Sequence, residues 1–341
     1  MSGMFPETPR LSLPPGGRMR GTAALMVGGV LLAGLTPGVS EASAQQFEWR
    51  QVWGDEFDYT GAPDPSKWGY EIGYIRNNEA QYYTDRPENV RVENGVLVIE
   101  ARKESYSGYG YTSASIHTLS TDRQTVLFST TCGRLEIRAK LPSTLRSWAA
   151  FWTLGTDTWT PEGTWPDSGE IDVLEYLTHT PQSVFANLHY KGADGTHKSA
   201  SGDYNVQRDD RWDAPMLHTD FHTFRIDWHA DRIEWYIDDR KYHEVSLASL
   251  AVSGSPFNSP HYLILNLAVG GDWGGMSGIA SDFTTDQFLV DYVRVYHLTP
   301  VPEPAASTVL AAICALGLVV ASQLAKAVSR SFPKKSTIQK S

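Results

Sequence analysis

The sequence predicts an all-β protein, an antiparallel β-sandwich. Between residues 46 and 298, short apolar or alternating runs are separated by turn-forming Gly, Asn, Asp and Pro residues. Many short strands at regular spacing are typical of a sandwich. No stretch has the strand-helix-strand rhythm of a parallel sheet, and only residues 247–252 suggest a short helix. The body is therefore expected to be one domain of sheets without large helices.

The strands can be followed along the chain. Residues 89–101 (NVRVENGVLVIEA) predict a hairpin, because alternating apolar residues flank Asn94-Gly95, a dipeptide favoured in two-residue turns. Residues 221–229 and 232–238 predict a second hairpin. The run at 262–269 is apolar throughout and too short for a helix. Further strands are predicted at 133–141, 148–154, 169–176, 184–190, 242–245 and 290–296.

The stretch GEIDVLEY, residues 169–176, places three carboxylates among apolar residues. Glu170 and Asp172 are two apart, so they share one face of a strand. Regular alternation would place Leu174 on that face and turn Glu175 away. One extra residue, a β-bulge, would bring Glu175 beside the other acids. Crowded charge on a half-buried strand is costly unless it is used, so the stretch predicts catalysis; solvated acids at a strand edge are the alternative.

The composition limits the function classes. The chain has 341 residues, a net charge of −10 and no basic block in its middle, so nucleic acid is not an expected partner. Its 11 Trp and 16 Tyr are many for this length, and they suit either a core or platforms for sugar rings. The two cysteines, Cys132 and Cys314, lie in the body and in a C-terminal apolar run, so no structural disulfide or cysteine metal site is expected.

The N-terminal region predicts export. Two arginines precede an apolar run at residues 22–35, which is short for a membrane span, and the small residues Ala-Ser-Ala follow at 42–44. This order is that of a secretion signal peptide, so we expect residues 1–44 to be removed and the mature chain to begin at Gln45. An N-terminal membrane anchor is the alternative.

The C-terminal region predicts a membrane-targeting signal. Pro-Glu-Pro at 302–304 is followed by an apolar run at 305–324, long enough to cross a bilayer, and then by basic residues that favour the cytoplasmic side. This order resembles the PEP-CTERM sorting signal of Gram-negative bacteria, which implies processing by a membrane protease of the exosortase type. A plain tail anchor is the alternative. We expect a folded domain at 45–298 outside the cell or on its surface, and a sorting tail at 299–341.

From about residue 53 to residue 296, the chain resembles glycoside hydrolase family 16. The acid stretch matches the bulged E-x-D-x-x-E form of the laminarinase-like branch, whereas lichenases have E-x-D-x-E. Matching segments occur in order at 77–83 (NNEAQYY), 87–90 (PENV), 111–114 (YTSA), 133–136 (GRLE), 148–152 (WAAFW), 265–273 (LNLAVGGDW) and 291–296 (DYVRVY). The resemblance implies a concanavalin A-like jelly roll with a concave cleft, and an endo-β-1,3-glucanase for which mixed-linkage β-1,3-1,4-glucan is a related substrate.

The acids fit the retaining double displacement that this resemblance implies. Retention needs two carboxyls about 5–5.5 Å apart, one to attack the anomeric carbon and one to protonate the leaving oxygen. Following the family's order, we assign Glu170 as nucleophile and Glu175 as general acid/base. Asp172 would hydrogen-bond the nucleophile and tune both pKa values. Three close carboxyls cannot all ionise freely, so at least one pKa should be raised.

The resemblance also implies residues that bind substrate. They are aromatic residues whose flat faces suit glucosyl rings, and polar residues at matching positions. The set is Asn78, Trp148, Trp165, His189, Asn266 and Trp273. A structural role is the alternative for His189 and Asn266, and Trp152 suits the core equally well. Ser115 stands where many laminarinases have a substrate-contacting arginine, so fine specificity is left open.

No cofactor is expected for catalysis, but a structural Ca²⁺ is common on the convex face of the family. The matching ligands are the backbone carbonyls of Glu56 and Gly95 and the carboxylate of Asp291, an all-oxygen set that suits Ca²⁺. The expected partner is a β-glucan, and the expected protein is a monomer. One alternative is an algal galactan hydrolase of the agarase or carrageenase type, which is disfavoured because no basic cluster lies near the acid stretch in sequence. Another is a non-catalytic glucan-binding protein, which would typically lack the two catalytic glutamates.

Overall fold

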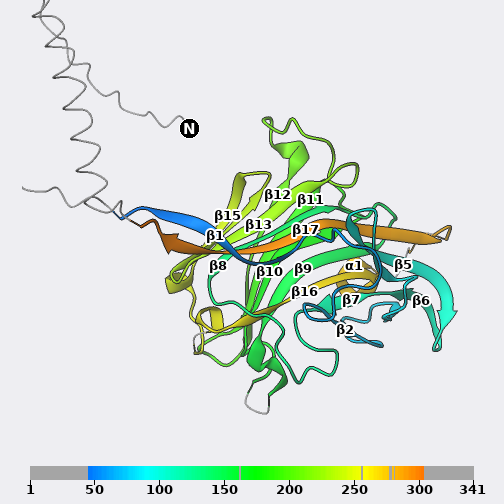
Figure 1. The fold of residues 1–341 in the computed structure, drawn as a ribbon, viewed down its shortest axis with the longest axis horizontal. Coiled ribbons are helices and arrows are strands. Elements are labelled where there is room, and N and C mark those ends of the chain that lie inside the picture. Colours follow the sequence, from blue (N-terminus) through cyan, green and yellow to red (C-terminus); the bar gives the residue numbers. More distant parts are fainter. Residues whose placement is uncertain (1–44, 161–162, 255, 276–278, 280, 303–341) are drawn as a thin grey trace, which may run out of the picture. The chain divides into compact units, whose positions relative to one another are not determined.

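The computed structural model describes residues 45–160, 163–254, 256–275, 279 and 281–302. The predicted signal peptide and the predicted sorting tail, with its apolar run at 305–324, lie outside these residues. The described chain forms two β-sheets packed against each other (Figure 1), so the predicted sandwich is confirmed. Every strand pair is antiparallel except β3 with β6. Among the described residues, no helix is long and apolar enough to cross a membrane.

The ten-stranded sheet is built around the C-terminal strand β17 (Thr285–Pro300). This strand pairs with β8 (Gly133–Lys140), β5 (Val96–Tyr106) and β1 (Phe47–Asp55), and it runs two residues past the expected domain end at 298. The other strands of the sheet are β3 (Gln81–Tyr83), β4 (Val90–Glu93), β6 (Tyr109–Ser113), β13 (His222–Trp228), β14 (Arg232–Ile237) and β15 (Arg240–Ser246).

The seven-stranded sheet has the order β12-β11-β10-β9-β16-β7-β2. The apolar run at 262–269 is β16, an interior strand that is buried along its whole length, which explains why the run lacks alternation. In sheet order, the strands are β12 (His197–Asn205), β11 (Ser183–Lys191), β10 (Glu170–Leu177), β9 (Ser147–Gly155), β16 (His261–Val269), β7 (Ser115–His117) and β2 (Gly69–Glu71).

Helical segments are short and lie in the connections. The predicted helix near 247–252 is the single 3₁₀ turn η3 (Leu247–Ser249). The other described helical turns are η1 (Thr156–Trp159), η2 (Val206–Arg208), η4 (Pro256–Asn258) and α1 (Gly271–Gly274).

The two predicted hairpins are confirmed. In the first, Glu93 of β4 faces Val96 of β5, and the turn residues Asn94 and Gly95 both have positive φ, 55° and 78°. This is the conformation that two-residue hairpin turns require and that an Asn-Gly pair tolerates. In the second hairpin, β13 and β14 pair in register around Ala230-Asp231.

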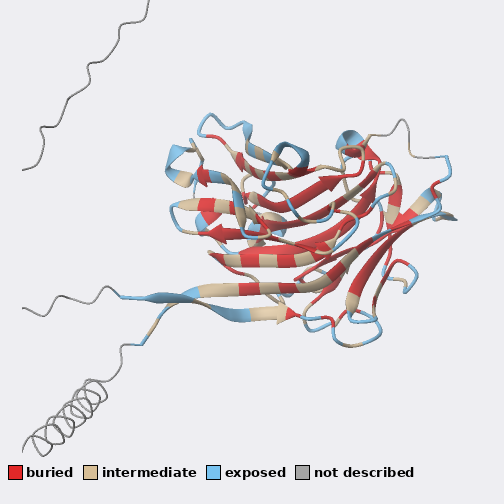
Figure 2. Ribbon diagram, turned by 90° about the horizontal axis from the view of Figure 1, so that it is seen from above, coloured by how far each residue is buried: buried red, intermediate tan, exposed pale blue. Residues whose placement is uncertain are grey.

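The hydrophobic core lies between the sheets. Burial alternates strictly along β8, where the apolar residues are buried and the charged ones are partly exposed. The apolar residues of β10, including Ile171 and Val173, join the same core cluster from the other sheet. Figure 2 shows the buried residues as bands along the strands, while β1 is mostly exposed at its N-terminal end. The core thus fixes one face of β10 and leaves its carboxylates on the other.

Candidate active site

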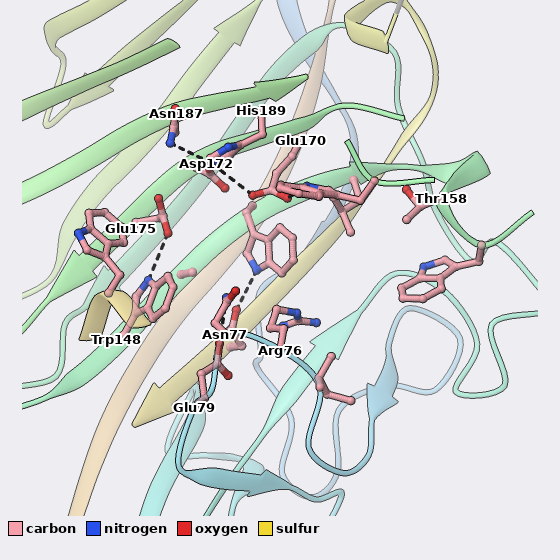
Figure 3. A pocket seen from close by; sticks show the side chains of 18 residues that line it. Arg76, Asn77, Glu79, Trp148, Thr158, Glu170, Asp172, Glu175, Asn187 and His189 are labelled. Atoms are coloured by element: carbon pink, nitrogen blue, oxygen red, sulfur yellow. Dashed lines mark hydrogen bonds and ion pairs between the residues drawn. The ribbon is translucent and has the colours of Figure 1, made fainter. Parts of the chain in front are cut away.

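A cavity of about 530 Å³ lies on the face of the seven-stranded sheet that points away from the core (Figure 3). Its volume is in the range of ligand-binding sites. All three predicted catalytic acids line it. Its remaining lining comes from the neighbouring strands β9, β11 and β16, from the loop before β3, and from the loops around η1 and α1.

The predicted β-bulge is present in β10. Against β11, Asp172 faces Asn187 and Glu175 faces Phe185, so three steps on β10 match two steps on its neighbour. The register against β9 also shifts after Asp172. Because β10 gains one residue here, Glu175 returns to the face that carries Asp172.

The extra residue is accommodated by the core. Val173 and Leu174 are consecutive, yet both are about 1% exposed and both belong to the core cluster. The backbone carbonyl of Asp172 accepts a 2.8 Å hydrogen bond from Trp235 Nε1, which reaches across from β14 of the other sheet. This bond satisfies a buried carbonyl where the ladder is interrupted, so the opposite sheet stabilises the bulge.

Strand register extends the acid site across the sheet. Residues that face each other in antiparallel neighbours lie on the same side of a sheet. The row through the bulge acid consists of Glu175, Ala150, Asn266, Ser115 and Glu71. The next row begins with Asp172, Trp152, Ile264 and His117. The first of these rows thus runs on one face of the sheet from the acids to β2, and its residues Glu175, Ala150 and Asn266 line the cavity.

The two outer acids are each held by an indole. Trp165 Nε1 donates to Glu170 Oε2 over 2.8 Å, and Trp148 Nε1 donates to Glu175 Oε1 over 3.2 Å. Figure 3 shows Trp148 beside Glu175 at one end of the acid row, with Glu170 at the other. Asp172 lies between them and is 3% exposed.

Burial raises the pKa of all three acids. The pKa of Glu175 is raised to about 8 by burial and by the charge of Glu170, and that of Glu170 to about 7 by burial. The Trp165 N–H, the charge of Arg76 and a hydrogen bond from Asp172 oppose the shift at Glu170. Burial and both neighbours raise the pKa of Asp172 well above its usual range. The Trp165 N–H and the charge of Arg76 thus favour ionised Glu170, while the charge of Glu170 favours protonated Glu175.

His189 lies beside the acids as a neutral imidazole. Its Nε2 is 3.5 Å from Asp172 Oδ2 and 3.8 Å from Glu170 Oε1, while its Nδ1 is 2.8 Å from His197 Nε2. Burial and the neighbouring His197 lower the pKa of His189 to about 4. Glu170, Asp172 and His189 could also hold a metal ion, since one ligand atom of each lies within 4.8 Å of the others.

Five of the six predicted binding residues line the cavity. They are Trp148, Trp165, His189, Asn266 and Trp273. Trp148 and Trp273 meet edge to face, with ring centroids 5.5 Å apart. The cavity lining does not include Asn78: its Nδ2 donates to Asp272 Oδ1 over 2.9 Å, and the preceding Asn77 lines the cavity instead.

Asn266 holds a neighbouring indole in place. It is 5% exposed, accepts a 2.8 Å hydrogen bond from Trp152 Nε1, and donates to Tyr83 Oη over 3.0 Å. The sequence was equally consistent with Trp152 in the core or in the cleft. Its side chain is 7% exposed and also lines the cavity.

Several lining residues were not predicted from the sequence. Asn187 lies two residues before His189 on β11, so the alternation of that strand could have identified it. Arg76, Glu79 and Trp159 come from connections whose position only the tertiary fold determines.

The three predicted calcium ligands approach one another on the ten-stranded sheet. On β17, Val293 faces Asp55 and Val290 faces Leu97, so Glu56 and Gly95 both approach the part of the strand that carries Asp291. The Asp291 carboxylate already accepts a hydrogen bond from Arg138 Nη1 through Oδ2. The donors are all oxygens, the ligand type that Ca²⁺ takes, and an ion there would share this carboxylate with Arg138.

Comparison with known proteins agrees with this geometry. Residues 77–294 match the model of the glycosyl hydrolases family 16. The chain is 40% identical over 291 residues to a β-glucanase of Rhodothermus marinus, covering 82% of this chain and 95% of the relative. This chain belongs to glycosyl hydrolase family 16.

Solved structures of family 16 support the fold as well. The laminarinase from Rhodothermus marinus has a TM-score of 0.64 and 41% identity, covering 74% of this chain and 99% of that one. A non-specific endo-β-1,3(4)-glucanase of the family has a TM-score of 0.63 and 36% identity, covering 75% of this chain and 93% of that one. The predicted jelly-roll fold is confirmed, and the chain is a glycoside hydrolase.

Proposed function

We propose that this family 16 enzyme is an exported endo-β-1,3-glucanase that cleaves laminarin-like glucans with retention of anomeric configuration. The observation that carries the proposal is the bulge in β10, which turns Glu170, Asp172 and Glu175 to one face of a cavity. The substrate class is supported by the similar β-glucanase, laminarinase and endo-β-1,3(4)-glucanase. The last of these favours mixed-linkage β-1,3-1,4-glucan as a further substrate.

In the first step, the Glu170 carboxylate attacks the anomeric carbon while Glu175 transfers its proton to the leaving oxygen. The glycosidic bond breaks and a glycosyl ester forms on Glu170. The Trp165 N–H favours ionised Glu170, and the raised pKa of Glu175 keeps its proton available. Asp172, whose raised pKa favours its protonated form, would donate a hydrogen bond to Glu170 and hold the nucleophile in position.

In the second step, Glu175 acts in the opposite direction. It has lost its proton and accepts one from a water molecule that attacks the same anomeric carbon. The ester bond to Glu170 breaks, and the sugar is released with the configuration it had in the substrate. Since the pKa of His189 is lowered to about 4, its imidazole is neutral at neutral pH and adds no positive charge beside the acids.

The test is reducing-sugar release from laminarin, lichenan, agarose and carrageenan assayed in parallel. We expect the highest rate on laminarin and a lower rate on lichenan. The highest rate on agarose or carrageenan would replace the proposal with a galactan hydrolase. Binding of laminarin without release from any of the four glycans would replace it with a glucan-binding protein.

We also propose that the enzyme is exported and held at the cell surface by its C-terminal segment. The basis is the order of signal, cleavage site, apolar run and basic tail in the sequence. Deleting residues 303–341 should release active enzyme from the envelope fraction into the medium. An unchanged distribution after this deletion would contradict the anchor, and blocked export after deletion of residues 2–44 would support the signal peptide.

A further inference from the structure

A buried carboxylate behind the cavity-lining residue Arg76 binds two arginines. Glu71 of β2 is 1% exposed and accepts hydrogen bonds from Arg76 Nη2, from Arg123 Nη2 over 3.1 Å, and from Ser115 Oγ over 2.7 Å. Burial alone would raise the pKa of Glu71, but the adjacent guanidinium of Arg76 and the Ser115 hydroxyl hold it below its usual value. One carboxylate therefore faces two cations; the carboxyl of Glu79 also acts on Arg76, and burial raises the pKa of Glu79.

Each arginine also lies over an indole of the cavity wall. The guanidinium carbon of Arg76 is 5.0 Å from the ring centroid of Trp152, and that of Arg123 is 4.0 Å from Trp159. Both indole N–H groups donate hydrogen bonds to other side chains: Trp152 Nε1 to Asn266 Oδ1 and Trp159 Nε1 to Tyr262 Oη, each over 2.8 Å. The rings are thus fixed, and the guanidiniums are fixed against them.

Arg76 is the member of this cluster that reaches the cavity. It lines the cavity together with Trp152, which faces Asp172 across the strand pair β9–β10. Among the described residues, the hydrogen bonds of Arg76 use Nη2 alone, and 21% of its side chain is exposed. Figure 3 shows its guanidinium between the acid row and the loop that carries Asn77. Nη1 and Nε are therefore free to donate to a ligand.

A sugar ring bound next to the acids would bring its hydroxyl groups toward Arg76, which lines the same cavity. A guanidinium offers several N–H donors in a fixed plane, and its orientation here is already set by Glu71 and Trp152. Binding to such a group costs little additional ordering. Ser115 lies in the row between Asn266 and Glu71, and its hydroxyl donates to the Glu71 carboxylate that binds Arg76.

We propose that Arg76 binds the hydroxyl groups of a glucosyl unit adjacent to the cleaved bond, and that Glu71 and Arg123 are positioning residues for it. This inference rests on the proposed function, because it concerns a subsite of the same cleft. It adds a specificity-determining residue contributed by the loop between β2 and β3.

The test measures affinity separately from hydrolysis. Laminarihexaose is titrated calorimetrically into Glu175→Gln, which cannot turn over, and into the same protein with Arg76→Met. Met keeps an apolar chain over Trp152 but removes the N–H donors. We expect Kd to rise about 10- to 100-fold, equivalent to about 1.4–2.8 kcal/mol. In the active enzyme, the same substitution should raise KM for laminarin by a similar factor. Because the charge of Arg76 also lowers the pKa of Glu170, kcat is compared at the optimum pH of each enzyme, where it should stay within about twofold.

Two variants separate this role from a structural one. Arg76→Met/Glu71→Gln removes the buried charge together with its partner, so it should recover thermal stability without recovering affinity. Arg134→Met is the matched control: Arg134 also pairs with a carboxylate, Asp227, and lies 4.8 Å from the ring of Trp49, away from the cavity. It should leave Kd unchanged.

A folded Arg76→Met protein with unchanged Kd would overturn the proposal. So would recovery of affinity in the double variant, because the loss would then come from a Glu71 carboxylate that keeps Arg123 but has lost its closer partner Arg76. Failure of the wild-type enzyme to hydrolyse laminarin is a separate outcome that rejects the proposed function, while the calorimetric comparison still decides the role of Arg76 in binding.

Discussion

The hydrogen bond from Trp165 to Glu170 should set the acidic limb of the pH–rate profile. Trp165 Nε1 donates to Glu170 Oε2 over 2.8 Å and favours the ionised nucleophile. Trp165→Phe keeps an aromatic face toward the cavity and removes the donor. The carboxylate loses a stabilising partner, so the pKa of Glu170 should rise further above about 7.

The size of the effect follows from the exposure of the pair. A hydrogen bond to a charged group contributes about 1.5–3 kcal/mol when buried. Trp165 is 46% exposed, so water replaces part of the bond, and we expect roughly 1.4 kcal/mol, or about one pH unit. For a nucleophile that must be ionised, kcat/KM should then fall about ninefold at pH 6 and about twofold at pH 8.

The assay is kcat/KM on laminarin from pH 4.5 to 9. Trp159→Phe is the control, because Trp159 is equally exposed and lines the same cavity, but its Nε1 donates to Tyr262 Oη rather than to an acid. The control should keep the wild-type acidic limb. If Trp165→Phe lost the same factor at every pH, Trp165 would act only through sugar contact, and the account of the nucleophile's pKa would be refuted.

Three further predictions concern the acid, the bulge and the metal. Glu175→Gln should reduce hydrolysis about 10²- to 10⁴-fold. Because burial raises the pKa of Glu175 from 4.5 to about 8, this variant should also melt at a higher temperature than wild type, and the difference should grow as pH rises from 4 to 8. An equal difference in melting temperature at pH 4 and pH 8 would contradict the raised pKa. Trp235→Phe leaves the Asp172 carbonyl without its buried donor and should lower the free energy of unfolding by about 1–3 kcal/mol in urea titrations, whereas an unchanged value would show that the bulge needs no such support. Chelation by EDTA should lower the melting temperature of the wild-type protein but not that of Asp291→Asn. An identical melting temperature with and without Ca²⁺ would contradict the proposed calcium site.

Local patterns in the sequence were sufficient for much of the fold. Asn94-Gly95 predicted its hairpin because few residues other than Gly and Asn tolerate positive φ at both turn positions. Leu174 predicted the bulge because it interrupts an otherwise regular alternation of acids and apolar residues. In both cases, the information lies within a few residues of the feature.

Other features depend on contacts between distant segments. The strand β12 (HKSASGDYN) lies at a sheet edge and is largely exposed, so it has no apolar alternation to predict it. Arg76 reaches the cavity because Glu71 and Trp152 hold it there, and no local pattern encodes those contacts. Asn78 has the predicted residue type, but Asp272, 194 positions away, binds its side-chain amide.

The account's central claim is double displacement by carboxylates on one bulged strand. Its most direct test is proton NMR of laminarin hydrolysis, read before mutarotation equilibrates the new reducing ends. The account predicts that the first anomeric signal is that of the β-anomer, because Glu170 and then water attack the same carbon in succession. A first signal from the α-anomer would show a single displacement, with the two carboxyls placed farther apart, and would contradict Glu170 as the nucleophile.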